Sequence, residues 1–278
     1  MEFVKMHGLG NDFIIVEMGS WVEANFLQPH AQLLCDRHLG IGADGLVAVG
    51  PDQEMDIFMR IFNSDGSEPE MCGNGIRCVA RYAYEKGWIA GHNISVKTLA
   101  GARYPQVEVS DGVVKSVRVD MGQPVLERRL IPMQGDGPAV RVPLVTSQGE
   151  FEITAVSMGN PHCINFVNDM DQVPIAAWGR EIEIHPLFPA KTNVEFVQVL
   201  ARDELIMRVW ERGAGITLAC GTGACATLVA AVLNGLSDRK AIIHLLGGDL
   251  LIEWNEESNR VYMTGPALHV FRGQIDLD

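Results

Sequence analysis

An internal repeat constrains this chain more than any other feature of its sequence. Residues 59–75 read MRIFNSDGSEPEMCGNG and residues 207–223 read MRVWERGAGITLACGTG. The two segments align without a gap at an offset of 148 residues, and a Gly-Asn pair recurs earlier in each half, at Gly10-Asn11 and Gly159-Asn160. Because these landmarks come in the same order in both halves, the sequence predicts two copies of one structural unit.

Each copy is predicted to be rich in strands and to contain one main helix. In the first copy Ile76, Val79, Ala80, Ala83 and Tyr84 follow the spacing of an amphipathic helix. The equivalent segment, Ala224–Leu233, is apolar nearly all round, which predicts a helix surrounded by protein. Gly87 and Gly235 stand where helix C-caps are expected. The runs that predict strands are Phe13–Val16, Leu46–Val49, Ile57–Phe62, Val107–Val109, Val113–Val119 and Val194–Val199.

These patterns predict an α/β (α+β) fold with two pseudo-symmetric domains, each a mostly antiparallel β-roll or barrel wrapped around a central helix. The length of 278 residues is sufficient for two domains. The stretch Ile131–Pro143 is rich in Pro and Gly and is interpreted as a loop or an edge strand. The change of domain is expected slightly earlier, near Asp120–Pro124.

Charge and cysteine usage exclude several classes of function. Twenty-two basic and 35 acidic residues give a net charge of −13, which argues against nucleic acid and anionic membranes as partners. No apolar stretch reaches the ~18 residues of a membrane helix, and the N-terminal segment lacks the pattern of a secretory signal. Six cysteines are too few for a disulfide scaffold. We therefore expect a cytoplasmic protein whose cysteines remain thiols.

Two of the cysteines stand at predicted helix starts. Cys72 opens Cys-Gly-Asn-Gly and Cys220 opens Cys-Gly-Thr-Gly. Free backbone N–H groups and the positive helix end are expected to lower the pKa of both thiols and to bind a carboxylate. If both thiols face one cleft, one can remove a proton from a carbon while the other delivers a proton to the opposite face. This pattern predicts inversion of a stereocentre next to a carboxylate, without a metal or pyridoxal phosphate.

Other interpretations of the cysteines and glycines are less favoured. The remaining cysteines, Cys35, Cys78, Cys163 and Cys225, are expected to be core residues. No Cys-x-x-Cys or His-x3–5-His spacing predicts a metal site. A disulfide between the two repeat cysteines is not expected in a reducing compartment. Gly40–Gly45 matches G-x-G-x-x-G, but a helix-like segment, Ala31–Leu39, precedes it and a strand follows, the reverse of the order that dinucleotide binding requires.

Longer motifs in both halves resemble the diaminopimelate epimerase family. They are HGLGNDF at residues 7–13, NSDGSEPEMCGNG at 63–75, SMGNPH at 157–162, ERGAG at 211–215 and ACGTG at 219–223. The resemblance spans the chain and implies an epimerase that interconverts LL- and meso-2,6-diaminopimelate in lysine and peptidoglycan-precursor synthesis, without cofactor or metal. It also implies a homodimer and a C-terminal strand that returns to the first domain. The domains would then be residues 1–119 plus 265–278, carrying Cys72, and residues 120–264, carrying Cys220.

The resemblance also implies roles for individual residues. In the LL-to-meso direction Cys72 would donate the proton and Cys220 would accept one, with His162 and Glu211 tuning the thiols. The positions that match substrate-binding residues are Asn11, Asn63, Gly73, Asn74, Asn160, Asn193, Glu211, Arg212, Gly221 and Thr222. Amide side chains suit a ligand with ammonium and carboxylate groups at both ends, and Arg212 can pair with a carboxylate.

The sequence departs from the family pattern at two places. Some relatives carry a Gln where this chain has Asp44-Gly45, and no role is assigned there. Ile216 stands where a Glu is common, and its side chain is expected to face away from the substrate.

Three alternative functions stay open from the residues. A proline or hydroxyproline racemase also uses two thiols, but the Asn-rich landmarks and Glu211-Arg212 favour a substrate with a second charged end. A Cys–His–Asn hydrolase or acyltransferase would leave the second Cys-Gly-x-Gly segment unexplained. A non-catalytic binding protein would not need both cysteines.

Overall fold

The structure is a computed structural model that describes residues 1–277. The chain divides into two compact units, each described here by itself. Unit 1 comprises Met1–Asp120 and the C-terminal segment from Thr264, and unit 2 comprises Met121–Met263. Both crossings of the chain between the units fall within strands, the first in β8 (Val113–Gly122) and the second in β17 (Val261–Gly265). The two domains that the family resemblance implies differ from these units by one residue at each crossing, and their assignment as domains stays a prediction.

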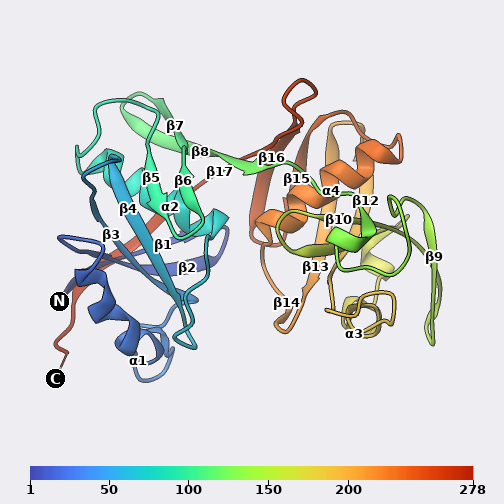
Figure 1. Ribbon diagram of the computed structural model, residues 1–278, viewed down its shortest axis with the longest axis horizontal. Coiled ribbons are helices and arrows are strands. Elements are labelled where there is room, and N and C mark those ends of the chain that lie inside the picture. The colour runs from blue at the N-terminus through green and yellow to red at the C-terminus, as the bar shows by residue number, and fades with distance from the viewer. Residues whose placement is uncertain (278) are drawn as a thin grey trace. The chain divides into compact units, whose positions relative to one another are not determined.

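Unit 1 contains a seven-stranded sheet in the order β18-β1-β2-β3-β4-β5-β6 and the hairpin β7–β8. Helix α2 packs against β1, β2, β4 and β7 (Figure 1). The strands are β1 (Glu2–Gly8), β2 (Asn11–Glu17), β3 (Gly45–Pro51), β4 (Ile57–Asn63), β5 (Val96–Thr98), β6 (Gly101–Arg103), β7 (Gln106–Ser110) and β18 (Leu268–Gln274). The helices are η1 (Glu23–His30), α1 (Ala31–Cys35) and α2 (Gly73–Glu85).

Unit 2 repeats this plan around helix α4. Its strands follow the order β17-β16-β15-β13-β12-β11-β10-β9, with β14 paired to β13. The strands are β9 (Val142–Thr146), β10 (Gly149–Ser157), β11 (Pro161–Phe166), β12 (Asn193–Ala201), β13 (Glu204–Glu211), β14 (Gly215–Ile216), β15 (Lys240–Leu245) and β16 (Gly248–Trp254). The helices are η2 (Arg128–Leu130), η3 (Met170–Gln172), α3 (Ile175–Glu183) and α4 (Gly221–Leu233).

The strand registers of the two units coincide. In unit 1 the parallel pair β2–β3 places Phe13 opposite Gly45, and in unit 2 the parallel pair β11–β12 places His162 opposite Asn193. The following antiparallel pairs also match, since Val47 faces Ile61 as Glu195 faces Val209. Helices α2 and α4 both have 13 residues and begin directly after their cysteines. The mixed α/β fold with two related sheet-and-helix units is thereby confirmed.

The two helices differ in sequence although both are largely buried. Helix α4 contacts β10, β11, β12, β13, β15 and β16, so apolar residues suit every side of it. Helix α2 contacts fewer strands and carries a polar stripe, in which Asn74 and Arg77 are buried and Glu85 is exposed. Both helices are followed by a glycine with φ of 71°, Gly87 and Gly235, as the repeat predicts.

The four cysteines expected in the core are all buried. The first helix is shorter than predicted, because α1 ends at Cys35 and the chain then turns around the Asp36 carboxylate.

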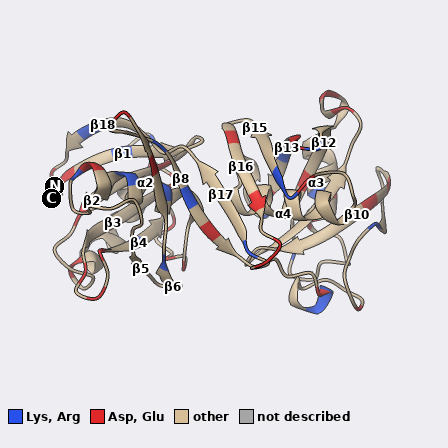
Figure 2. Ribbon diagram, turned by 90° about the horizontal axis from the view of Figure 1, so that it is seen from above, with Lys and Arg blue, Asp and Glu red and all other residues tan. Residues whose placement is uncertain are grey.

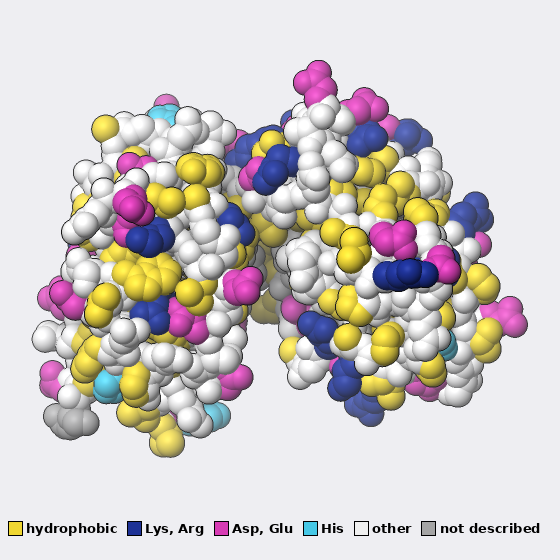
Figure 3. All heavy atoms as spheres, viewed as in Figure 1, with side chains coloured by type: hydrophobic (Ala, Val, Ile, Leu, Met, Phe, Trp, Pro, Cys, Tyr) yellow, Lys and Arg dark blue, Asp and Glu magenta, His cyan; other side chains and the backbone are white. Residues whose placement is uncertain are grey.

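The surface agrees with the charge composition. Basic and acidic residues are scattered along the ribbons of both units (Figure 2). On the face drawn in Figure 3, Lys and Arg side chains lie singly or in small groups among acidic and apolar ones. Within residues 1–277, none of the helices has the length and hydrophobicity needed to cross a membrane.

Candidate active site

In unit 2, Cys220 is the N-cap residue of α4, where its extended backbone precedes the first helical turn. Its side chain is 6% exposed, and Sγ lies 3.6 Å from the hydroxyl oxygen of Thr222. The first backbone N–H groups of a helix have no carbonyl partner within it, and at the start of α4 the N–H of Gly223 faces the Cys220 sulfur.

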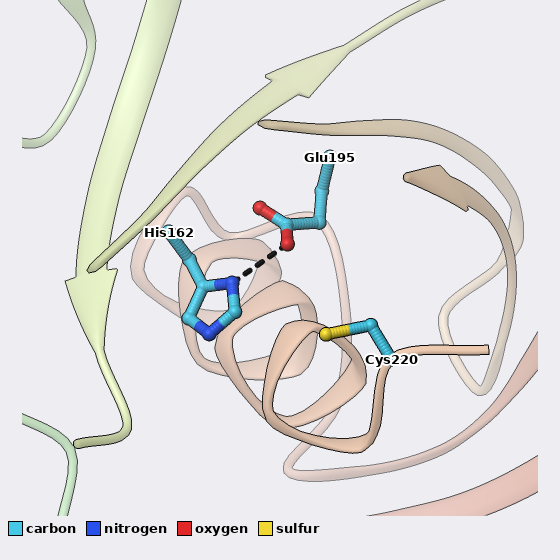
Figure 4. A group of neighbouring side chains, drawn as sticks. All are labelled: His162, Glu195 and Cys220. Carbon is cyan, nitrogen blue, oxygen red and sulfur yellow. Dashed lines mark hydrogen bonds and ion pairs between the residues drawn. The ribbon is translucent and has the colours of Figure 1, made fainter. Parts of the chain in front are cut away.

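His162 and Glu195 form a buried pair beside this thiol (Figure 4). The Glu195 carboxylate lies 2.7 Å from His162 Nδ1, and both side chains are completely buried. The other ring nitrogen, Nε2, lies 3.0 Å from Asn160 Oδ1. Both ring nitrogens therefore face oxygen acceptors, so the ring is held in one orientation from two sides.

Glu211 adds a second, partly buried carboxyl group near Cys220. Burial raises the pKa of Glu211, and the charge of Glu195 raises it further. Thr217 donates a hydrogen bond to the Glu211 carboxylate. Burial also raises the pKa of the Cys220 thiol well above its ordinary value, and the charges of Glu211 and Glu195 act in the same direction. The expectation that the helix start lowers the pKa of Cys220 is therefore wrong, because desolvation and two carboxylates outweigh the backbone N–H groups.

The ligand types in this cluster are those that zinc prefers. One atom each of His162, Glu195 and Cys220 lies within 4.8 Å of the other two. However, two ligands of one tetrahedral zinc ion stand roughly 3.3 Å apart. The 2.7 Å separation between His162 and Glu195 is the length of a charge-assisted hydrogen bond. The spacing favours a hydrogen-bonded pair over a metal centre.

In unit 1, Cys72 is the N-cap residue of α2, and its sulfur accepts a hydrogen bond of 3.4 Å from the backbone N–H of Gly75. Asn11 Oδ1 lies 4.0 Å from the sulfur and accepts a 3.0 Å hydrogen bond from Asn74. The Asn11 amide in turn donates to Asp44 over 2.7 Å. The structure thus brings Asn11 and Asn74, both predicted to bind substrate, to the thiol of their own unit.

The remaining predicted binding residues have local partners. Asn63 donates to Ser67 over 2.9 Å. Asn193 is buried, donates to the Pro161 carbonyl and accepts from the Arg212 backbone N–H, so its amide joins the ends of two strands. The Arg212 side chain is exposed and donates to the Ala190 carbonyl over 3.0 Å. Gly73 and Gly221 begin the two helices, and Ile216 is 49% exposed.

Sequence reasoning missed two residues of these sites. Asp44, to which no role was assigned, holds Asn11 in place. Glu195 lies inside the strand-like run Val194–Val199. A single acidic residue in a run that predicts a buried strand was the signal that could have identified it. Only the register that places β12 beside β11 brings this carboxylate to His162.

Comparisons with known proteins agree with the fold and the motifs. The chain matches the family model for diaminopimelate epimerase over residues 3–127 and 154–270. It is 59% identical to the diaminopimelate epimerase of Heliobacterium modesticaldum and 56% identical to that of Moorella thermoacetica, and each alignment covers 100% of both proteins.

Solved structures with low identity share the fold alone. A hydroxyproline epimerase from Agrobacterium vitis superposes with a TM-score of 0.71 at 16% identity, covering 100% of this chain and 93% of its own. A phenazine biosynthesis protein from Enterococcus faecalis superposes with a TM-score of 0.72 at 13% identity, covering 99% of both chains. The full-length relatives and the family model place the chain among the isomerases that act on amino acids. The chain belongs to the diaminopimelate epimerase family.

Proposed function

We propose that this protein interconverts LL- and meso-2,6-diaminopimelate by proton transfer at one α-carbon, with Cys72 and Cys220 as the two acid–base groups. The observation that carries this proposal is the repeated unit in which a 13-residue helix begins directly after a cysteine. The full-length relatives named diaminopimelate epimerase support the choice of substrate.

The proposed step moves two protons. From LL to meso, the Cys220 thiolate removes the α-proton and becomes a thiol, while the Cys72 thiol delivers its proton to the opposite face and becomes a thiolate. The reverse reaction exchanges these roles. An α-proton is much less acidic than a thiol, and each pKa unit of that difference costs about 1.36 kcal/mol. Backbone N–H groups at the two helix starts would stabilise the negative charge that develops on the carboxylate, so no metal or cofactor is required.

His162 and Glu211 are proposed to tune the thiols, and the amide residues to hold the substrate. His162 lies in the Cys220 cluster, and the charge of Glu211 acts on the Cys220 thiol. Asn11, Asn74 and Asn160 supply amide groups near the two sites, while Arg212 supplies an exposed guanidinium for the distal carboxylate. Asn63, Gly73, Asn193, Gly221 and Thr222 complete the proposed substrate-binding set.

The decisive experiment is incubation with LL-diaminopimelate in deuterated water under reducing conditions. We expect meso product that carries deuterium at one α-carbon, without added pyridoxal phosphate or metal. Proline and hydroxyproline, offered under the same conditions, are expected to keep their α-protons. The epimerase proposal fails if wild-type protein incorporates no deuterium into diaminopimelate.

Single serine substitutions test the two-thiol mechanism. Cys72→Ser and Cys220→Ser should each reduce turnover by at least about 10³-fold, because the hydroxyl of serine is far less acidic than a thiol. Cys35→Ala, a substitution in the apolar core of unit 1, serves as the control and should keep turnover. Full turnover by either serine variant contradicts the mechanism.

We further propose that the protein is a homodimer and works in the reducing cytoplasm, where both thiols stay reduced. Strand β18 supports self-association, because it is an edge strand with three exposed apolar side chains: Leu268, Val270 and Phe271. Sedimentation velocity should give a dimer for the wild type and a monomer for Val270→Asp. A wild-type monomer at micromolar concentration contradicts this assembly.

A further inference from the structure

Glu195 is a buried carboxylate for which the proposed reaction has no stated use. One of its oxygens bonds to His162 Nδ1, while the other, Oε2, has no hydrogen-bond partner among residues 1–277. A buried carboxylate with an unpartnered oxygen is unfavourable for folding, so its presence calls for an explanation outside stability.

The internal repeat shows that the strand architecture does not require an acid at this position. In register, His162, Glu195 and Glu211 of unit 2 correspond to Phe13, Val47 and Asn63 of unit 1, listed in the same order. Val47 is completely buried on the same strand of the same sheet plan. An apolar residue therefore fits the position, and the acidic side chain in unit 2 serves the local chemistry instead.

Groups from four elements face the Cys220 thiol. His162 comes from β11, Glu195 from β12 and Glu211 from β13, while α4 contributes the Thr222 hydroxyl and the Gly223 backbone N–H. Two carboxylates thus stand against one imidazole in a buried site. A thiolate at Cys220 would face net repulsion as well as the cost of desolvation.

We propose that Glu195 is a positioning residue that holds the His162 ring and keeps Cys220 in its thiol form between turnovers, so that the two repeated halves are chemically unequal. The consequence of this role of Glu195 for catalysis rests on the proposed function. With its proton in place, Cys220 is ready to deliver it, which is its role in the meso-to-LL direction. In this form the enzyme reacts with the meso isomer once Cys72 is a thiolate that can remove the α-proton. An LL molecule can react only after Cys220 has lost a proton and Cys72 has gained one.

The test measures alkylation of Cys220 by iodoacetamide as a function of pH, in the full-length Cys72→Ser chain, with mass spectrometry to identify the modified residue. Thiolate is the reactive form, so the pH midpoint of alkylation reports ionisation. Burial raises the pKa of Cys35 to about 11 and that of Cys78 to about 12, and site-resolved detection separates these thiols from Cys220.

Removing the charge should move the Cys220 midpoint. Glu195→Gln is expected to lower it by about one pH unit or more, the usual effect of a like charge at this distance. Glu195→Asp keeps the charge and should stay near the parent value. Glu204→Gln is the matched control, because Glu204 forms a 2.9 Å pair with His244 on the same sheet, with the carboxylate 47% exposed. Glu204→Gln should not change the pH midpoint of Cys220 alkylation.

The proposal is overturned if the Glu195→Gln midpoint stays unchanged or rises while circular dichroism shows a folded chain. Glu195→Val, which copies Val47 of unit 1, gives a second test if the Gln variant does not fold, and its midpoint must also fall. Alkylation needs no turnover, so the two proposals fail separately. If the wild-type protein does not epimerise diaminopimelate while the Cys220 midpoint still shifts in the Glu195→Gln variant of the Cys72→Ser chain, the proposed function is refuted and the role of Glu195 stands.

Discussion

At the residue scale, the two helix starts differ in how much room surrounds the second glycine of their Cys-Gly-x-Gly segments. Gly223 and Gly75 are equivalent in the repeat. A Cβ atom at Gly223 would stand 2.7 Å from Glu195 Oε1 and 3.2 Å from Cys220 Sγ. A Cβ atom at Gly75 would meet the mobile end of Met59 at 3.0 Å and the Cys72 Cβ at 3.5 Å. The glycine in unit 2 is therefore required by the side chains of the Cys220 site.

Gly223→Ala is expected to reduce turnover at least about 10-fold, because the new methyl group displaces the Glu195 carboxylate or the thiol. Gly75→Ala should cause a smaller loss, since Met59 can adjust. Steady-state rates of diaminopimelate epimerisation, with melting temperatures to confirm folding, compare the two. Equal losses of turnover in Gly223→Ala and Gly75→Ala would show that the close approach of Glu195 to Gly223 does not matter for turnover.

A second residue-scale feature is the charge cluster that supports Asn11. Lys5 is buried and lies 2.8 Å from Asp12, and Arg37 contacts both Asp12 and Asp44. Burial alone would raise the pKa of Asp12, but hydrogen bonds from Arg37 and Lys5 hold it well below its ordinary value. The cluster ties the start of β2 to the loop before β3.

Asp12→Asn should lower the free energy of unfolding by about 3 kcal/mol at pH 7, because it leaves the buried Lys5 without its counter-charge. A carboxyl group with a lowered pKa stabilises the fold fully above its unfolded pKa of about 3.9 and loses this contribution as the pH falls towards the folded value. Urea unfolding at pH 7 and near pH 3 measures both effects. Wild type and variant should differ less at the acidic pH, and an undiminished difference there contradicts the assignment.

At the element scale, α4 holds unit 2 together because strands contact it from several sides. All residues from Gly223 to Ala231 are buried, and Leu228 has no exposed surface. Helix α2 is buried to a similar extent, but its buried residues include the polar Asn74 and Arg77. The largely apolar sequence of α4, in which Thr227 is the buried polar residue, suits this enclosure.

Leu228→Ala is expected to destabilise the protein by about 2–5 kcal/mol, through lost burial and the cavity that remains. Leu246→Ala is the matched control, because Leu246 is 51% exposed in the turn between β15 and β16, and it should change stability by less than about 0.5 kcal/mol. Urea denaturation of both variants tests the difference. A loss below about 1 kcal/mol for Leu228→Ala would mean that α4 is not a packed core element.

At the scale of the whole molecule, unit 1 is assembled from both ends of the chain. Strand β18 pairs antiparallel with β1 from Glu2↔Gln274 to His7↔Leu268, and the Met1 backbone bonds to Ile275. Loss of β18 would leave the largely buried strand β1 as an open edge of the sheet.

A chain that ends at residue 266 is expected to lose cooperative unfolding of unit 1 and to aggregate. A synthetic peptide of residues 266–278, added in excess, should restore solubility, because it can supply the missing strand. Scanning calorimetry and light scattering measure both outcomes. A truncated chain that unfolds at the temperature of the full-length protein would contradict this role for β18.

The sequence by itself determined the repeat, the enclosed helix and the two cysteines at helix starts, because these depend on local spacing and on the side chains that a buried helix accepts. Only the tertiary structure decided the electrostatics of the Cys220 site. Glu195 is hidden in an apolar strand run, and its effect on Cys220 arises from strands that pair across more than 30 residues. The expected lowering of the Cys220 pKa failed for this reason: a helix start is visible in sequence, whereas burial and long-range charges are not.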